Sequence, residues 1–459
     1  MRWALRYTGA MDGSRDMDTP RATPRVEVSA APARDFDEQT AERRSRSRTR
    51  AAWYSADLGY MAVEFAIPLY LTPWMVTQLG VPATIFGLAS ALSSWAVALS
   101  GPYIGVRADE RLTRRRWYGG SAFFAAVLLA LLYFLPHGTS SSVVGLVIIA
   151  VVANYFFQLA GFIYNASMLE AAGGANIVSV SAIGMGIAYI GGVVGILVIK
   201  LVVSDTVLHG GNTEGFALSL AALLFLISVI PGVLARGLWQ NQGRRPRERE
   251  GRRLRRILAL WQQASREHDA GWLLAGYFAM NSAIMGFTLY LPLHLQLTTD
   301  FSSSARTLIL GGAVLSAGIG AGLTALLKPS MKTVRTIFLV GLSLWALNAF
   351  GFGLATQPRL IVGLACLHGL LSGPLISSAR GVFAKTFGAE YQALAFGLFG
   401  ATSRFSLGLG AALWPLASAA MHGPRSTSLG LATMGVVAAI GVPLMWKWSP
   451  RAAGEVLAS

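Results

Sequence analysis

Charged residues are scarce in this sequence: Asp, Glu, Lys and Arg together make up 13% of its 459 residues. Soluble domains average about 25% charged residues. Two or three soluble domains, the usual expectation at this length, would need more charge to cover their surfaces. The chain is instead 54% hydrophobic, which predicts a protein embedded in a membrane.

Cysteine is almost absent, because Cys366 is the only one. A disulfide framework or a multi-cysteine zinc site is therefore excluded. The sequence also lacks a phosphate-binding loop, an HExxH motif and a convincing set of nucleophile, base and orienting residue. We expect no cofactor, no metal and no enzymatic activity, and an intramembrane enzyme is the least favoured class.

Lysine is rare as well, since 33 of the 38 basic residues are arginine. The net charge of +16 would suit a nucleic-acid partner, but the basic residues lie between the apolar runs. That distribution is typical of membrane topology, so we expect no nucleic-acid partner. Residues 1–50 hold 11 arginines and eight acids but no apolar signal-peptide core, which predicts a disordered cytosolic tail.

Twelve apolar segments follow this tail, most of them 20 to 27 residues long. About 20 apolar residues in a helix cross the ~30 Å hydrocarbon core of a bilayer. The predicted fold class is an all-α membrane protein with twelve transmembrane helices. The segments lie at roughly 54–79, 84–106, 117–135, 143–165, 178–203, 216–236, 271–297, 305–327, 336–355, 361–383, 392–416 and 428–447.

One long polar stretch separates the sixth segment from the seventh and divides the spans six plus six. Within it, Leu254, Ile257, Leu258 and Trp261 form one stripe of a basic amphipathic helix suited to an anionic membrane surface; a solvated linker is the alternative. The expected domains are a tail at 1–50, six helices at 51–236, the basic linker at 237–270, six helices at 271–448 and a tail at 449–459.

The basic residues also predict the orientation. With the N-terminus in the cytosol, the inside stretches carry 32 Lys and Arg and the outside stretches carry three. The positive-inside rule therefore places both termini in the cytosol. Short loops and the lack of eukaryotic targeting signals favour a bacterial inner membrane.

Two acids lie in the first span. Glu64 is about ten residues into it, near the middle of the membrane at 1.5 Å per residue. An ionisable group there costs at least ~2.5–3.5 kcal/mol and usually has a role. We expect Glu64, and Asp57 two turns earlier, to act in proton coupling or substrate binding; a structural pair with a basic residue, or a water-filled cavity wall, is the alternative.

Two arginines lie in spans of the second half. Arg404 is at mid-depth in span eleven, where it can bind an anionic substrate group or pair with a carboxylate of the first half. Arg380, near the cytosolic end of span ten, is a further candidate for proton coupling or substrate binding; the alternative is that its side chain extends toward the membrane interface. We expect His294 and His368 to be structural.

Polar residues share one face of the fourth span. Asn154, Gln158 and Asn165 are spaced for one side of a helix, and Asn281 lies at similar depth in span seven. A polar face in a membrane must meet a cavity or another helix. We expect these four residues to line a cavity. Glycine clusters in spans five, eight and eleven predict close, movable helix packing.

The loop after the second span reads GPYIGVRADERLTRRRW. We expect it to close the cytosolic side of the protein as a gate; a positive-inside turn is the alternative. The residues of this expected gate are Gly105, Asp109, Arg111, Arg114 and Arg115.

This loop resembles the signature of the major facilitator superfamily, with Glu110 and Thr113 as departures. Within that superfamily, four stretches resemble the vacuole-effluxer family of amino-acid exporters and its bacterial members. They are YNASMLEAAGG (164–174), VSAIGMGIAYIGGVVGIL (180–197), GPLISSARGVFAKTF (373–387) and AFGLFGATSRFSLGLGAALW (395–414).

The resemblance implies two six-helix bundles around a cavity lined by spans one, four, seven and ten, and transport by alternating access. It implies secondary active export of a small polar metabolite such as an amino acid. Glu64 would couple transport to protons and Arg404 would anchor a carboxylate or join the bundles. The alternatives are a lipid or drug exporter, which a wide apolar cavity would favour, and a non-transporting receptor or scaffold.

Overall fold

The computed structural model describes most of the chain between residues 31 and 449. By internal contacts the chain forms two units, Met1–Arg44 and Ser45–Ser459, and every contact discussed below lies in the second. The expected amphipathic stripe from Leu254 to Trp261 lies outside the described residues. These are 31–136, 139–173, 177–203, 212–240, 262, 270–327, 329–386, 392–423 and 426–449.

The N-terminal half is built from six long helices. Its first helix continues as two π-helical turns, and a short helix follows the fourth and the sixth of the long helices. The elements are α1 (Ala31–Ala66), η1 (Ile67–Leu71), η2 (Trp74–Gln78), α2 (Ala83–Glu110), α3 (Arg114–Phe134), α4 (Ser140–Ala166), α5 (Met168–Ala172), α6 (Ile177–Val203), α7 (Thr213–Leu234) and α8 (Gly237–Gln240).

The C-terminal half repeats the pattern with six long helices, and the described ranges contain no β-strand. Five of these helices have the length and hydropathy of a membrane span, as do five in the N-terminal half, which gives ten within the described residues. The C-terminal elements are α10 (Ala270–Thr298), α11 (Ser303–Leu327), α12 (Met331–Leu354), α13 (Pro358–Thr386), α14 (Gln392–Ala419) and α15 (Ser426–Lys447).

The all-α membrane class is thereby confirmed. The two predicted spans outside the ten, at 54–79 and 392–416, coincide with α1 and its π-helical continuation and with α14. One boundary differs from expectation: α1 begins at Ala31, so residues 31–50 are helical where a disordered tail was predicted. Alanine, glutamate and arginine are frequent there, and their helix propensity outweighs the lack of apolar residues.

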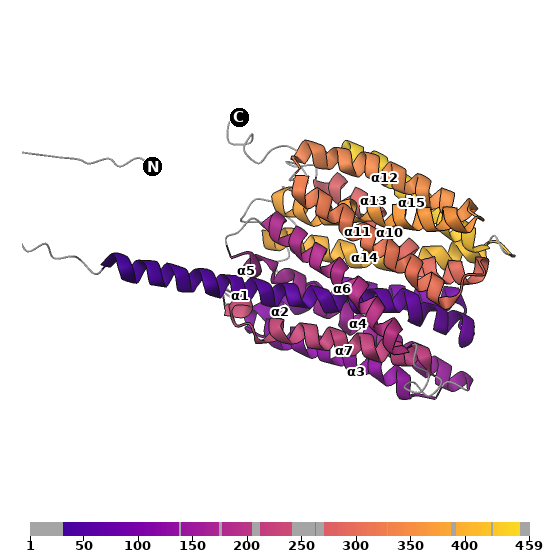
Figure 1. The fold of residues 1–459 in the computed structure, drawn as a ribbon, viewed down its shortest axis with the longest axis horizontal. Coiled ribbons are helices and arrows are strands. Elements are labelled where there is room, and N and C mark those ends of the chain that lie inside the picture. The colour runs from indigo at the N-terminus through magenta and orange to yellow at the C-terminus, as the bar shows by residue number, and fades with distance from the viewer. Residues whose placement is uncertain are drawn as a thin grey trace, which may run out of the picture. The chain divides into compact units, whose positions relative to one another are not determined.

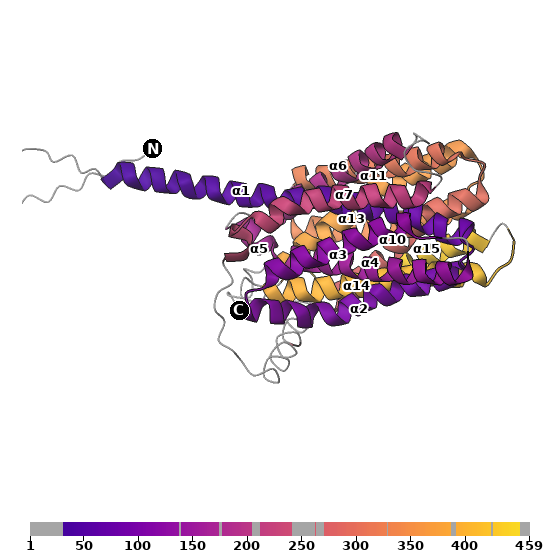
Figure 2. The same cartoon turned by 90° about the horizontal axis from the view of Figure 1, so that it is seen from below.

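Successive long helices alternate in direction and lie nearly parallel to one axis (Figure 1). The two halves meet mainly along two helix pairs, α2 with α14 and α6 with α11. Figure 2 shows α2 beside α14. We call the end that holds the start of α3 and the end of α15 the near end. The far end holds η2 and the end of α10.

Each half has its own apolar core. One cluster of buried side chains lies within residues 53–238 and a second within 270–448. A third cluster joins the halves, because Phe65 and Tyr189 of the N-terminal half pack with Val314 and Ala317 of α11. The boundary between the halves is therefore partly apolar.

Glycine allows the closest helix contacts. A Cβ atom at Gly191 of α6 would lie 2.6 Å from the backbone oxygen of Leu58 on α1. One at Gly408 of α14 would lie 2.6 Å from Cδ1 of Trp95 on α2. Helices in a membrane associate largely by such packing of small residues.

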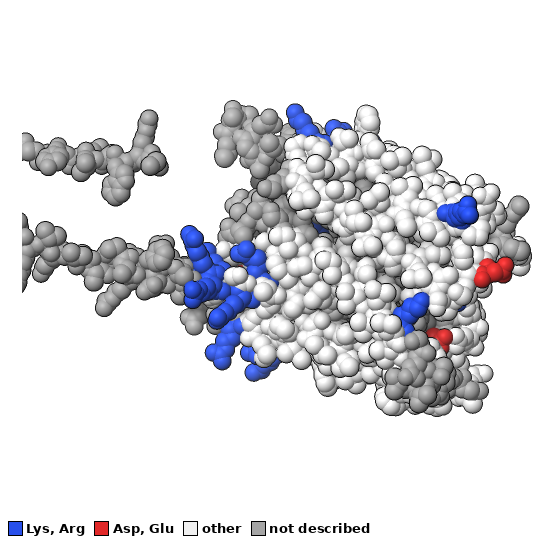
Figure 3. Space-filling model, viewed as in Figure 1, with Lys and Arg blue, Asp and Glu red and all other residues white. Residues whose placement is uncertain are grey.

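Basic side chains gather at the near end (Figure 3). Arg107, Arg111, Arg115 and Arg116 are exposed there, whereas the acidic side chains visible in this view lie toward the far end. This asymmetry has the form that the positive-inside rule describes.

Candidate functional site

The first helix places two acids on one face and then changes its geometry. Asp57 and Glu64 are seven residues apart, which is close to two helical turns. Four residues after Glu64 comes Pro68, which has no N–H to donate to the Glu64 carbonyl. The π-helical segment η1 starts at this point, and π-helical turns are frequent at functional sites. Glu64 therefore lies where the helix is least regular.

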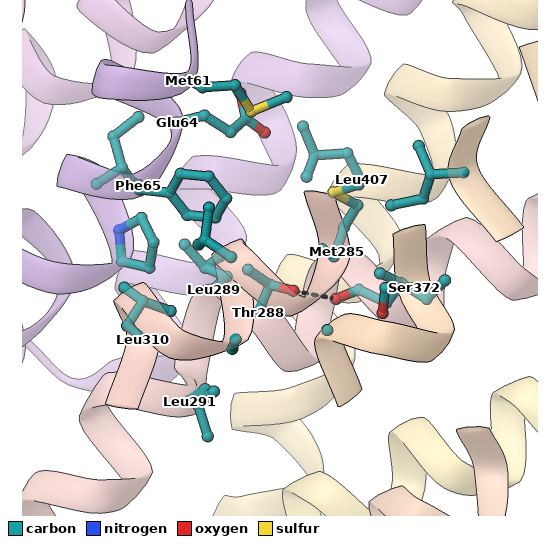
Figure 4. A pocket seen from close by; sticks show the side chains of 18 of the residues that line it. Met61, Glu64, Phe65, Met285, Thr288, Leu289, Leu291, Leu310, Ser372 and Leu407 are labelled. Carbon is teal, nitrogen blue, oxygen red and sulfur yellow. Dashed lines mark hydrogen bonds between the residues drawn. The ribbon is translucent and has the colours of Figure 1, made fainter. Parts of the chain in front are cut away.

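Glu64 lines a cavity between the two halves with a volume of about 140 Å³. Figure 4 shows Met61 and Glu64 of α1 directed toward the space in front of Met285 and Leu407. Most of the wall is apolar, and Glu64 is the one charged residue among the described residues that line it. The cavity draws side chains from α1, η1, α2, α4, α6, α10, α11, α13 and α14, a wider set than the four spans expected.

Two amides of α4 form the polar wall of the N-terminal half. Asn154 donates from Nδ2 to the Ser93 hydroxyl of α2 at 2.7 Å. Gln158 donates from Nε2 to the Ser94 hydroxyl at 2.8 Å and is 1% exposed. Both amides line the cavity, where the sequence placed them.

The opposite wall holds a histidine that we expected to be structural. His368 of α13 lines the cavity, and its Nε2 lies 3.3 Å from the Thr288 hydroxyl of α10. Its ring stacks on Phe287 with a centroid distance of 4.3 Å. Ser372, one turn later, accepts a hydrogen bond from Trp345 at 3.0 Å. A lone histidine in an apolar span gives no sequence signal for this position.

Arg404 is the basic residue next to Glu64. Its Nη2 would lie 3.0 Å from a Cβ added at Gly161, so it reaches from α14 onto α4. Its guanidinium interacts electrostatically with Glu64, Tyr60 and Tyr277. Within the described residues no ion pair of 4.0 Å or less links Arg404 to Glu64, and Arg404 does not line the cavity.

Arg380 joins the two halves toward the near end. From α13 it donates to Asn165 Oδ1 of α4 at 2.6 Å, and its Nη1 lies 3.2 Å from the sulfur of Met185. Its guanidinium carbon is 6.0 Å from the centroid of Trp53. Asn165 was expected in the cavity wall, and the structure places it in this contact instead.

Asp57 lies beside this contact. It is 5% exposed, and its charge interacts with that of Arg380, although no ion pair of 4.0 Å or less links the two in the described residues. Its Oδ2 would lie 2.7 Å from a Cβ at Gly184, and among the described residues this oxygen has no hydrogen-bond partner. Asp57 and Arg380 thus form one charged layer at the near end, and Glu64 and Arg404 form a second layer deeper in the protein.

The far end is closed by a different contact. Gln296 of α10 donates to the Thr77 hydroxyl of η2 at 2.9 Å. The cavity therefore lies between two contacts that join the halves, Thr77–Gln296 at the far end and Arg380–Asn165 at the near end.

The remaining expected site residues lie within single halves. Asn281 donates to the Ser406 hydroxyl at 2.6 Å and does not line the cavity. Arg114 pairs with Glu170 at 3.0 Å, so it joins α3 to α5. Gly105 lies in α2 and would bring a Cβ to 3.6 Å from Phe162. Arg111 and Arg115 are exposed, and the side chain of Asp109 lies outside the described residues.

No group of three or more His, Cys, Asp or Glu that could hold a metal ion occurs in the part of the chain that the structure describes. Two helical halves with a cavity between them form an arrangement found in secondary transporters.

The sequence assigns the chain to a family. The model of the Major Facilitator Superfamily matches residues 58–332, which is more than half of the chain. The chain therefore belongs to this superfamily of membrane transporters. No curated protein matches its sequence.

Solved structures share the fold. The nucleoside transporter NupG has a TM-score of 0.63 at 15% identity, covering 87% of this chain and 100% of that one. The proton:xylose symporter XylE has a TM-score of 0.62 at 12% identity, covering 90% and 99%. A structure of a proton-dependent oligopeptide transporter has a TM-score of 0.60 at 13% identity, covering 88% and 100%. At these identities the likeness concerns the fold alone.

Proposed function

We propose that this transporter moves a small molecule in exchange for protons, and that Glu64 carries the proton. The observation behind this proposal is the position of Glu64, the one charged side chain among the described residues that line a mainly apolar cavity. A carboxylate is costly in such surroundings unless a proton or a cationic group neutralises it. Substrate and proton can therefore compete for one site as the halves rock around it.

The cavity supports a substrate with a compact apolar body. Its volume of about 140 Å³ is close to that of apolar cavities that hold a single benzene ring, about 150 Å³. Met61, Phe65, Met285 and Leu289 contribute to its wall, which suits such a body better than a fully polar metabolite. This apolar wall favours the drug-exporter alternative, with a small drug-like substrate, over a sugar-like one.

Amino-acid export is the second candidate. The resemblance of residues 164–197 and 373–414 to the vacuole-effluxer family supports it, and so does one structural observation. Arg404 and Glu64 carry opposite charges that interact and match the carboxylate and ammonium of a zwitterion. Arg404 does not line the cavity in this structure, so a substrate carboxylate would reach it only after the halves move. An apolar amino acid would combine this pairing with the apolar wall.

The gathering of arginines at the near end supports a cytosolic position for that end, and thus for both termini. The contact of Arg380 with Asn165 would then be the cytosolic gate, in place of the loop after α2. Export from a bacterial cytosol across the inner membrane is the direction that we propose.

Counterflow in proteoliposomes tests the proposal. The wild-type chain and Glu64→Gln would be assayed with labelled amino acids and small drug-like compounds, with Asp300→Asn as the control because Asp300 is exposed at the far end. We expect the wild-type chain and Asp300→Asn to exchange one compound class and to show pH-driven uptake, and Glu64→Gln to lose the pH-driven uptake. Exchange of no compound by folded wild-type protein would reject transport of these substrates, and pH-driven uptake by Glu64→Gln would reject the role of Glu64.

A further inference from the structure

Two hydroxyl groups of the cavity wall and one beside it each donate their only proton to a backbone carbonyl. Ser94 donates to the Ser90 carbonyl at 3.1 Å, and Ser93 donates to the same carbonyl at 2.8 Å. Thr288 donates to the Ile284 carbonyl at 2.8 Å. A serine or threonine hydroxyl has one proton, and back-bonding of this kind within a helix consumes it. Each of the three oxygens can therefore only accept a further hydrogen bond.

The amide of Gln158 must then donate to Ser94. The 2.8 Å contact between Gln158 and Ser94 would join two acceptors if the amide were reversed, so the network fixes which end is the NH₂ group. The Gln158 Oε1 is left buried without a partner among the described residues. In the same way, Asn154 donates from Nδ2 to the Ser93 hydroxyl, so the Asn154 oxygen points away from Ser93.

The ring of His368 is fixed in the same way. Because Thr288 donates to the Ile284 carbonyl, we assign Nε2 of His368 as the donor in its contact with the Thr288 hydroxyl. In the neutral ring the other nitrogen, Nδ1, is then an acceptor. It is buried and has no partner in the described part of the chain, and the residue is 4% exposed.

The polar groups that these bonds leave free are acceptors on both walls. Glu64 and Gln158 supply a carboxylate and an amide oxygen from the N-terminal half, and His368 supplies a ring nitrogen from the C-terminal half. Buried acceptors without a donor are rare in folded proteins. A ligand that brings N–H groups would satisfy them, whereas a carboxylate in the same place would meet only other acceptors.

We propose that the substrate binds through a protonated amine, held by the Glu64 carboxylate, Gln158 Oε1 and His368 Nδ1, with its apolar body against the rest of the cavity. This inference rests on the proposed transport function and specifies its substrate class. Gln158 and His368 act in it as binding residues that select for N–H donors.

Three probes with one ring and different polar ends test this selection. Benzylamine, benzyl alcohol and benzoate would be titrated against the purified full-length chain, and affinity measured by calorimetry and by the shift in unfolding temperature. We expect benzylamine to bind and benzoate not to bind, with the alcohol between them. In Gln158→Met and His368→Phe, which keep the shape and remove the acceptor, benzylamine should bind on the order of tenfold more weakly.

Asn348→Leu is the matched control, because Asn348 is a buried amide of α12 outside the cavity and both of its polar side-chain atoms have no partner among the described residues. It should leave benzylamine affinity unchanged. Each variant must elute as one species and unfold near the wild-type temperature, which separates loss of an acceptor from loss of the fold.

Two results would overturn the proposal: benzoate binding as tightly as benzylamine, or benzylamine affinity unchanged in both Gln158→Met and His368→Phe. If the protein exchanges some other compound but binds no amine, the amine site is wrong and the transport function stands. If the folded protein neither binds nor exchanges any compound tested, both proposals fail.

Discussion

Two arginines reach from the C-terminal half toward acids of α1, and their surroundings differ. Arg380 donates to Asn165 at 2.6 Å and lies against Met185 and Trp53. Arg404 has Glu64 beside it but no ion pair of 4.0 Å or less with it in the described residues. A guanidinium with fixed neutral partners stabilises one closed arrangement, whereas one held mainly by charge can exchange partners during a cycle. This difference supports our proposal that the near-end layer is a gate and the deeper layer a coupling site.

The largest expected effect follows from removing the charge of the deeper layer. In Arg404→Leu, Glu64 loses its countercharge and is expected to hold a proton permanently, so transport should fall to background. Arg404→Lys keeps the charge and should retain part of the activity. Proton-driven uptake in liposomes measures both. Full activity of Arg404→Leu would show that the two layers do not differ in this way.

A reversible cross-link at the far end should also stop transport. Cys366 is the only cysteine, so a Cys366→Ser background allows one engineered pair, Thr77→Cys with Gln296→Cys, at the positions where Gln296 Nε2 lies 2.9 Å from the Thr77 hydroxyl. We expect activity to be lost on treatment with a bifunctional thiol cross-linker that contains a disulfide, and restored by reductant. Each single cysteine variant is the control, and transport that continues in the cross-linked protein would contradict alternating access at this end.

Loss of the near-end contact should open the cavity without abolishing transport. A hydrogen bond to a charged group contributes about 1.5–3 kcal/mol, so its removal shifts a conformational equilibrium about tenfold or more. In Arg380→Leu with Cys366→Ser, a cysteine at Ser90 of the cavity wall should react about tenfold faster with a polar thiol reagent. The same cysteine with Arg380 intact is the reference, and an unchanged labelling rate would remove Arg380 from the gate.

The smallest effect concerns the backbone that holds the near-end layer. A Cβ at Gly184 would lie 2.7 Å from Asp57 Oδ2 and 2.9 Å from Trp53, whereas a Cβ at Gly186 meets nothing within 4 Å. Overpacking typically costs about 1–3 kcal/mol. Gly184→Ala should therefore lower the unfolding temperature and increase labelling of the cavity, and Gly186→Ala should do neither. Equal behaviour of the two variants would contradict this account of α6 packing.

The span positions could be predicted because hydropathy acts locally along a chain. Glu64 and Arg404 could be predicted for the same reason, because counting residues from the ends of a span shows that a charged residue lies near the middle of the membrane. The amides Asn154 and Gln158 followed from helical spacing. Asn165 shares that spacing, but it accepts a hydrogen bond from Arg380 instead of lining the cavity. The spacing places a residue on one face of a helix and does not identify the helix that packs against that face.

The partners of the expected gate loop were not predictable. Arg114 pairs with Glu170, 56 residues later in sequence, and the contact that joins the halves at the near end uses Arg380 instead. His368 was expected to be structural because a single histidine in an apolar helix carries no pattern. Its position depends on Thr288 of another helix, and such a pairing exists only after the helices have packed.

The sequence by itself determined that this chain is an all-α membrane protein and where its buried charges lie along the spans. Both follow from the free-energy cost of placing polar groups in hydrocarbon, and this cost depends on the residues of each segment by itself. The tertiary structure alone decided which arginine faces which acid, which contacts close the two ends of the cavity, and which acceptors remain without donors. Those properties depend on the faces along which distant helices pack, and no single segment encodes them.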